Sequence, residues 1–345
     1  MITGDFFASM RRLIAAVAAA LVVSVPLHAA DSLLLSRFAD YLDSLRQQTG
    51  IPGLAAVIVG PSDISWDRGF GYSDVDKLVR TETFTPFQLD GVTQTVTAAI
   101  ILRCVEHHRL SLDDRLPDGS ASIRQILSHT TDAGAFSYQP QRLDLLKPIV
   151  ESCDATGSFR GSIAQLLDRN VMWDSVPGPD AVGLPPTAAI SQAQLDRYKS
   201  VLPRLAVPYA VDGQKRVSKS QYSVTGLAAA SGLISTARDY ARFDLALRNG
   251  TLLTDGSLQA AWNPVNGKSG LGWFVQNYNG EKIVWAFGQS DNASSSLEIT
   301  LTARATTLVL LANSDGLAKG FPLSSGDVTT SPFGKLFLEL FVGNK

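Results

Sequence analysis

The segment FQLDGVTQTVTAAIIL, residues 87–102, constrains the possible folds more than any other part of the sequence. It begins with an extended, turn-containing stretch and continues as a helix that we expect over about Thr93 to Glu106. The first half of this helix is apolar on every side, so it must be buried inside a large protein. The 345 residues of the chain are enough to enclose such a helix, in two lobes or in one large domain.

Charge and cysteine content exclude several classes of function. The formal net charge is −2 and no lysine- or arginine-rich run occurs, so we expect no nucleic-acid partner. Cys104 and Cys153 are too few for a thiolate zinc site, and both a disulfide and two buried thiols are compatible with the sequence. His107 and His108 are neighbours that point in different directions, and no HExxH motif is present. We therefore expect no metal and no cofactor.

The N-terminus has the three-part layout of a secretory signal peptide. Arg11 and Arg12 precede an apolar run that extends to about Leu27, and the small residues Ala29 and Ala30 follow. A membrane anchor is the alternative, but about 15 apolar residues fall short of the roughly 20 that span a bilayer. We therefore predict a signal peptide over residues 1–30 and a periplasmic or secreted protein without a stable membrane span.

Strand patterns occur near both ends of the remaining chain, and short helical patterns occur between them. A helix is expected over residues 31–48, followed by the strands LAAVIVG and WDRGFGYSD. The last third contains an amphipathic helix, four strand-like segments joined by tight turns, and a closing helix. The pattern predicts an α+β fold for residues 31–345, with one antiparallel sheet built from both ends. We assign an α/β lobe to about 31–80 and 225–345, and a helical lobe to about 81–224.

The order of these segments resembles the serine β-lactamase and penicillin-binding-protein superfamily, in particular its class C β-lactamase-like branch. The resemblance extends from about Leu33 to Phe341 and is carried by IPGLAAVIV, GFGYSDVDK, TFTPFQLDGVTQTVTAAIILRCVEHHRLSLDDRLPD, IRQILSHTTD, MWDSVPG, ASGLISTARDYARF, GLGWFVQ and LVLLANSDG. It implies a β-lactamase/transpeptidase-like fold, an antiparallel sheet flanked by helices with an inserted, mostly helical lobe. The active site would lie in the cleft between them.

The first catalytic motif of that family, SxxK, is degenerate in this chain. In the family, Ser and Lys lie one helical turn apart at the start of the central helix, so that Lys can take the Ser proton. GVTQ occupies this place, which puts Gly91 at the nucleophile position and Gln94 at the base position. Gly91 has no side chain, and the Gln94 amide cannot accept a proton at ordinary pH. No lysine of the chain has a serine three residues before it, and no GxSxG motif occurs.

The second and third motifs are degenerate as well. Tyr138 matches the tyrosine of YxN, but Pro140 stands at the asparagine position. Ala286 replaces the His or Lys of the third motif, whereas Gly288 keeps its glycine. Another register would place Gln289 at the cation position and Asp291 at the glycine, which is no better for catalysis. The string KSG at residues 268–270 precedes the expected strand, and we do not expect it to face the cleft.

Four residues near these motifs have alternative interpretations. Thr93 and Thr95 are candidate substitute nucleophiles, although a cap or a packed hydroxyl is the commoner role for such a threonine. His129 is a candidate base, but a hydrogen-bonded structural role is favoured. Asp90 could cap the central helix, or could repel the anionic ligands that active relatives bind.

These residues lead to one hypothesis and one alternative. We predict an exported pseudoenzyme without acyl-serine hydrolysis that binds a peptide, a peptidoglycan fragment or another small ligand non-covalently. The alternative is a working esterase, peptidase or β-lactamase-type hydrolase with an unidentified nucleophile, for which Thr93 is the best candidate. Candidates for the ligand cleft are Asp90, Gly91, Gln94, Tyr138, Ala286, Gly288 and Gln289.

Overall fold

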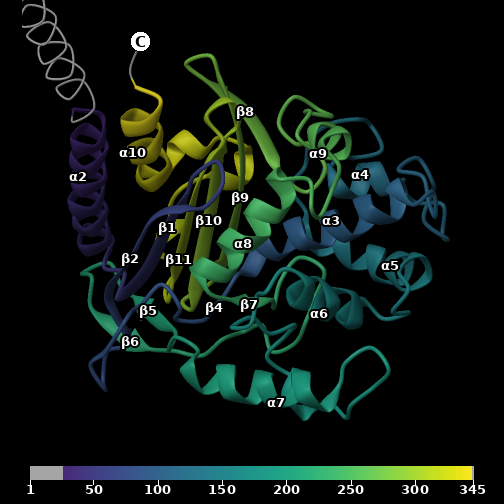
Figure 1. Ribbon diagram of the computed structural model, residues 1–345, viewed down its shortest axis with the longest axis horizontal. Helices are drawn as coiled ribbons and strands as arrows, with labels where there is room; N and C mark the ends of the chain where they lie inside the picture. The colour runs from purple at the N-terminus through teal and green to yellow at the C-terminus, as the bar shows by residue number, and fades with distance from the viewer. Residues whose placement is uncertain (1–25, 344–345) are drawn as a thin grey trace, which may run out of the picture.

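One antiparallel sheet organises the fold (Figure 1). The computed structural model describes residues 26–343, with side chains from residue 33 onward. Within this part of the chain, seven strands pair in the order β3-β2-β1-β11-β10-β9-β8, and every neighbouring pair is antiparallel. The strands are β1 (Gly53–Val59), β2 (Ile64–Asp74), β3 (Val79–Arg80), β8 (Phe274–Tyr278), β9 (Glu281–Ser290), β10 (Ser294–Leu301) and β11 (Thr306–Ala312).

The pairing of β1 with β11 confirms that the two ends of the chain build one sheet. Leu54 lies opposite Ala312, and the register continues to Val59 opposite Thr307. All seven residues of β1 are buried, so both faces of the sheet are covered. Side chains that alternate along β1 therefore belong to two different hydrophobic clusters.

A layer of helices covers each face of the sheet (Figure 1). Helices α2 (Pro26–Thr49) and α10 (Pro332–Phe341) pack together on one face, where the rings of Phe38 and Phe341 lie 5.6 Å apart. Helix α8 (Ala237–Arg248) packs against β1 and β11 on the other face. Helix α8 is the amphipathic helix expected from the sequence, and Thr236 caps it by accepting a hydrogen bond from the backbone N–H of Asp239.

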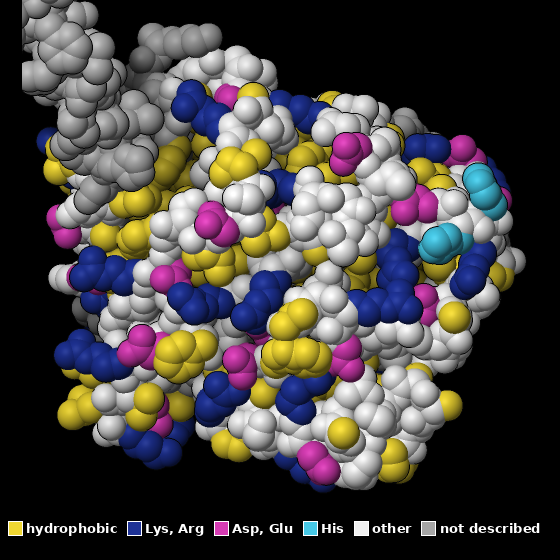
Figure 2. All heavy atoms as spheres, viewed as in Figure 1, with side chains coloured by type: hydrophobic (Ala, Val, Ile, Leu, Met, Phe, Trp, Pro, Cys, Tyr) yellow, Lys and Arg dark blue, Asp and Glu magenta, His cyan; other side chains and the backbone are white. Residues whose placement is uncertain are grey.

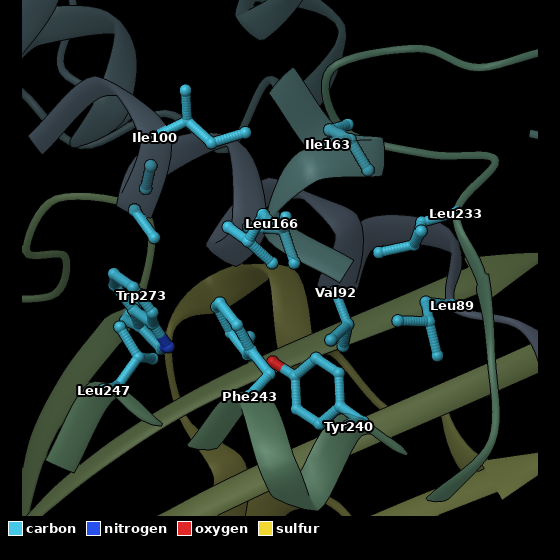
Figure 3. Close-up of a cluster of buried hydrophobic side chains, with 14 of the residues drawn as sticks. Leu89, Val92, Ile100, Ile163, Leu166, Leu233, Tyr240, Phe243, Leu247 and Trp273 are labelled. Atoms are coloured by element: carbon cyan, nitrogen blue, oxygen red, sulfur yellow. The ribbon is translucent and has the colours of Figure 1, made fainter. Parts of the chain in front are cut away.

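The buried central helix α3 (Thr93–Glu106) is confirmed. Every residue from Thr93 to Leu102 is buried. Its apolar side chains join those of α6 (Phe159–Arg169) and α8 in one cluster, which Figure 3 shows around Leu166 and Phe243. Each large aliphatic side chain buried there stabilises the fold by about 1.5–3 kcal/mol.

The remaining elements surround this core. They include two small sheets, β4–β7 and β5–β6. The elements are α4 (Ile123–Leu127), α5 (Lys147–Cys153), α7 (Gln192–Val201), α9 (Asp255–Ala261), β4 (Phe87–Gln88), β5 (Tyr209–Val211), β6 (Val217–Lys219), β7 (Ile234–Ser235), and the 3-10 turns η1 (Asp90–Val92) and η2 (Pro140–Leu146). The division into two lobes at residues 81 and 224 stays a prediction.

Helix α2 contains the first helix expected from the sequence. The pattern predicts a helix over residues 31–48, and within the described residues α2 extends from Pro26 to Thr49. Ala29 and Ala30, the last two residues of the predicted signal peptide, lie within α2. Residues 1–25 of the predicted signal peptide lie outside the described residues.

A disulfide joins Cys104 near the end of α3 to Cys153 at the end of α5, with the two Cα atoms 5.9 Å apart. Of the two alternatives that the sequence leaves open, a disulfide and two buried thiols, the structure has the disulfide.

On the face shown in Figure 2, basic and acidic side chains are interspersed, in keeping with the small net charge.

Candidate functional site

A cleft of about 450 Å³ lies at the start of the central helix, between η1, the end of β9 and several loops. Of the positions predicted from the sequence, Asp90, Gly91, Tyr138, Pro140 and Gln289 line it. Gln94, Ala286 and Gly288 are buried and do not belong to its wall. The other lining residues are Gln141, Asp144, Val224, Ala228, Ala230, Ser231, Phe287, Asp291, Phe321 and Ser324.

The nucleophile position is packed against the strand opposite. A Cβ atom on Gly91 would lie 2.5 Å from the backbone oxygen of Phe287 and 3.2 Å from the hydroxyl of Tyr138. A Cβ atom on Gly288 would lie 2.3 Å from the backbone oxygen of Leu89 and 2.6 Å from the backbone nitrogen of Gly91. Real Cβ atoms do not approach other atoms this closely. Turn η1 and strand β9 therefore meet backbone to backbone, and only glycine fits at either position.

Gln94, at the base position, is hydrogen-bonded to a neutral histidine. The Nε2 atom of His129 lies 3.1 Å from Oε1 of Gln94, and the backbone N–H of Gln139 donates to Nδ1 of His129 at 3.4 Å. Nδ1 therefore accepts, so Nε2 carries the hydrogen and donates to Gln94. Burial, together with the nearby charge of Arg142, lowers the pKa of His129 to about 4. Both ring nitrogens are engaged, so His129 has no free nitrogen with which to activate a nucleophile.

Tyr138 forms part of an aromatic cluster on one wall of the cleft. Its ring centroid lies 4.7 Å from that of His129, 5.2 Å from that of Phe274 and 5.3 Å from that of Phe287. Burial raises the pKa of the Tyr138 hydroxyl, which therefore keeps its proton. The arrangement suits a packing and ligand-contacting tyrosine better than a proton acceptor.

The two threonines that could replace the nucleophile are buried. Thr93 has no exposed surface, and its hydroxyl has no hydrogen-bond partner. The Thr95 hydroxyl donates to the backbone oxygen of Val92 at 2.8 Å and lies 2.9 Å from the hydroxyl of Tyr240. Neither threonine lines the cleft.

Asp90 has an unusual environment for a carboxylate. It adopts a positive φ of 46° and is only 2% exposed, although it belongs to the cleft wall. The Ser294 hydroxyl donates to Oδ2 of Asp90 at 2.7 Å, whereas Oδ1 has no partner. Burial raises the pKa of Asp90 to about 7, against the lowering effect of the Ser294 hydrogen bond. Asp90 does not cap the helix, because neither η1 nor α3 has a side-chain cap.

The third-motif positions Ala286, Gly288 and Gln289 lie in the second half of β9. Ala286 is fully buried in the core that covers α3 and cannot supply a cation to the cleft. Gln289 is exposed, and its Nε2 donates to Oδ1 of Asp291 at 3.2 Å. Lys268 of the KSG string lies beside β8 in a separate hollow, where its Nζ donates to the backbone oxygen of Ser325 at 2.7 Å.

Several lining residues carry no sequence signal. Asp144 comes from η2, Ser231 from the loop before β7, and Phe321 from the loop after β11. They reach the cleft only because the chain brings distant loops together. The contact between His129 and Gln94 also joins segments that are distant in the sequence. The SxxK register identified Gln94, but no sequence pattern indicated that His129 would contact it.

The fold and the position of the cleft define the class of protein. An antiparallel sheet between two helical layers, with a cleft at the start of a buried central helix, is the β-lactamase/transpeptidase-like fold. The chain belongs to the Beta-lactamase family, whose family model matches residues 38–324. By family and fold it is thus related to hydrolases.

Two curated relatives match at different lengths. Protein flp of Staphylococcus aureus (strain NCTC 8325 / PS 47) is 34% identical over 68 residues, which cover 20% of this chain and 14% of Protein flp. The putative penicillin-binding protein PbpX of Bacillus subtilis (strain 168) is 22% identical over 296 residues, which cover 79% of this chain and 73% of that protein.

Two solved structures share the fold. An octameric penicillin-binding protein homologue from Pyrococcus abyssi superposes with a TM-score of 0.71 and 18% identity, over 90% of this chain and 78% of that one. The D-amino acid amidase from Ochrobactrum anthropi SV3, complexed with D-phenylalanine, superposes with a TM-score of 0.67 and 15% identity, over 90% of this chain and 98% of that one.

Proposed function

We propose that the protein is an exported pseudoenzyme of the Beta-lactamase family that binds a peptide or a peptidoglycan fragment non-covalently in the cleft. One observation carries the proposal. The motif register assigns Gly91 to the nucleophile position of the family, and the backbone oxygen of Phe287 occupies the space that a Cβ atom there would need. A serine hydroxyl therefore has no room to form an acyl-enzyme there.

The lysine that would take the serine proton in the SxxK motif is also missing. Gln94 replaces the lysine and is hydrogen-bonded to His129, which is neutral and engaged at both nitrogens. The alternative, a hydrolase that uses Thr93, requires that hydroxyl to reach a substrate. Thr93 is fully buried and outside the cleft wall, so these observations favour the pseudoenzyme.

The ligand class is proposed from the cleft and from the relatives. About 450 Å³ suits a fragment of one or two residues, and the wall combines aromatic rings with polar side chains, as ligand sites commonly do. Two of the similar proteins are penicillin-binding proteins by name, and the amidase was solved with phenylalanine. A small peptide is therefore the ligand that we propose.

Export is supported by the cysteines. The disulfide between Cys104 and Cys153 is of the kind that persists in oxidising compartments such as the periplasm. The signal-like residues at the N-terminus point in the same direction. Within residues 26–343, none of the helices has the length and apolar character needed to span a bilayer.

Covalent probes test the loss of catalysis. The protein is incubated with a fluorescent penicillin, a fluorophosphonate and a chromogenic cephalosporin, and we expect neither label nor turnover. Two variants separate the alternatives: Thr93→Val removes the hydroxyl, and Thr93→Ser keeps it. Label that persists in Thr93→Ser and disappears in Thr93→Val would identify Thr93 as a nucleophile and overturn the proposal.

Calorimetric titration with small peptidoglycan fragments tests the binding. Ser231 lines the cleft, so Ser231→Trp places a large side chain in it, and we expect this variant to lose binding. Ser120 is exposed and outside the cleft wall, so Ser120→Trp serves as the matched control and should bind as the wild type does. Equal binding by both variants would place the ligand site elsewhere.

A further inference from the structure

The charged side chains that line the cleft are all acidic. Asp90, Asp144 and Asp291 belong to its wall, and no lysine, arginine or histidine does. A concave site lined by charges of one sign concentrates ligands of the opposite sign. The charge of the wall therefore distinguishes between possible ligands even though the cleft is small.

Two of the three carboxylates have partners within the protein. Asp144 lies 3.1 Å from Nζ of Lys147 and accepts a hydrogen bond from the backbone N–H of Ala229 at 2.9 Å. Asp291 accepts from the side-chain amide of Gln289 at 3.2 Å. These contacts leave Asp144 partly neutralised and Asp291 with a neutral donor only.

Asp90 differs because its side chain is buried, whereas Asp144 and Asp291 are exposed. Its one hydrogen bond comes from the hydroxyl of Ser294, and its Oδ1 atom is buried without a partner. A buried carboxylate oxygen without a donor is costly, and such an oxygen in the wall of a cleft points to a ligand that supplies the donor. The charge of Asp90 adds to burial in raising the pKa of the nearby Tyr222 hydroxyl.

Aromatic rings form the apolar part of the same wall. Tyr138, Phe287 and Phe321 all line the cleft, and the rings of Tyr138 and Phe287 lie 5.3 Å apart. The face of an aromatic ring attracts a cation, and a carboxylate beside such rings is a common arrangement for binding ammonium groups. The acidic and aromatic residues thus favour the same type of ligand group.

We propose that the cleft selects ligands with a protonated amino group, which pairs with Asp90 and lies against the rings of Tyr138, Phe287 and Phe321. The inference rests on the proposed function, because it names the charge of the ligand that binds non-covalently in this cleft. The absence of the third-motif His or Lys also affects which ligand charge the cleft accepts. With Ala286 in that place, no cationic side chain belongs to the wall, and its acidic side chains repel an anionic ligand.

Three probes of one shape test the proposal: benzylammonium, benzyl alcohol and benzoate. Binding is measured by calorimetry at pH 8 and low salt, where the Asp90 carboxylate is ionised. We expect benzylammonium to bind at least about tenfold more tightly than benzyl alcohol, and benzoate to bind most weakly, since a charge-assisted hydrogen bond is worth at least that much.

Asp90→Asn is the informative variant. Asparagine has nearly the same shape, can accept the Ser294 hydrogen bond, and tolerates the positive φ of this position. We expect it to lose about tenfold in affinity for benzylammonium and clearly less for benzyl alcohol, whose hydroxyl can donate to either side chain but carries no charge. Phe321→Leu should weaken benzylammonium more than benzyl alcohol. Asp113 is exposed and outside the wall, so Asp113→Asn is the control and should change neither probe.

The outcomes separate this inference from the proposed function. Equal or tighter binding of benzyl alcohol or benzoate overturns the amine selectivity, as does an Asp90→Asn variant that binds benzylammonium like the wild type. Absence of binding by all three probes at millimolar concentration overturns it too. None of these results affects the pseudoenzyme, which fails only if the penicillin or fluorophosphonate probe labels the protein.

Discussion

The substitution Gly91→Ala tests whether the nucleophile position is closed by the strand opposite. The added Cβ atom would lie 2.5 Å from the backbone oxygen of Phe287, about 1 Å closer than ordinary van der Waals contact. A strand backbone cannot rotate away as a side chain can, so η1 or β9 must shift. Overpacking of this kind costs about 1–3 kcal/mol.

An opposing effect reduces the expected loss. Gly91 does not have a positive φ, so alanine is not strained there, and it gains about 0.4–1 kcal/mol by restricting the unfolded chain. We therefore expect Gly91→Ala to lower the free energy of unfolding by about 1–2 kcal/mol. Urea denaturation with an unchanged m-value measures this. Gly91→Ser should behave in the same way and should not restore acylation.

Gly256 provides the matched control. It lies within helix α9, and a Cβ atom there would meet no atom within 4 Å. Gly256→Ala should therefore raise the free energy of unfolding by up to about 1 kcal/mol. If Gly91→Ala is as stable as the wild type while Gly256→Ala shows its gain, the position is open and the reasoning about the closed reactive site is wrong.

Three further predictions concern buried polar groups and the disulfide. Burial raises the pKa of Asp90 from 3.8 to about 7, so the protonated side chain makes its full contribution to stability below pH 3.8, and this contribution is lost as the pH rises through 7. Relative to Asp90→Asn, the free energy of unfolding of the wild type should therefore fall by up to about 4 kcal/mol between pH 4 and pH 8, measured by urea titrations. Reduction of the Cys104–Cys153 disulfide, which spans 49 residues, should lower the unfolding free energy by about 4 kcal/mol, measured with and without reductant. Tyr240 donates to Oε2 of the buried Glu298 at 2.7 Å, so Tyr240→Phe should cost about 1–3 kcal/mol in thermal or urea unfolding, and an unchanged stability would show that water replaces the hydroxyl.

Local patterns were sufficient to predict most of the fold. The hairpin between β8 and β9 follows from Asn279 and Gly280, which both adopt the positive φ that a tight hairpin turn needs. The central helix follows from its uniform apolar surface, which only a buried position satisfies.

The candidate site could be predicted only in part. The motif register grouped six positions, of which Gly91, Tyr138 and Pro140 line the cleft. The other three, Gln94, Ala286 and Gly288, are buried behind its wall. The orphaned oxygen of Asp90 and the contact of His129 with Gln94 could not be foreseen, because both depend on how loops and strands far apart in the sequence meet. The same is true of the acidic character of the wall, which appears only when three separate segments are brought together.

The backbone contact between Gly91 and β9 also restricts the evolutionary paths open to this protein. A serine returned to position 91 alone meets the carbonyl of Phe287, so this reversion is harmful until β9 moves. A change that moves β9 brings no catalytic benefit by itself, since Gln94 and Ala286 still lack the required groups. Under the proposed function, this sign epistasis means that single substitutions at these positions, each favourable by itself, do not lead back to an acylating enzyme.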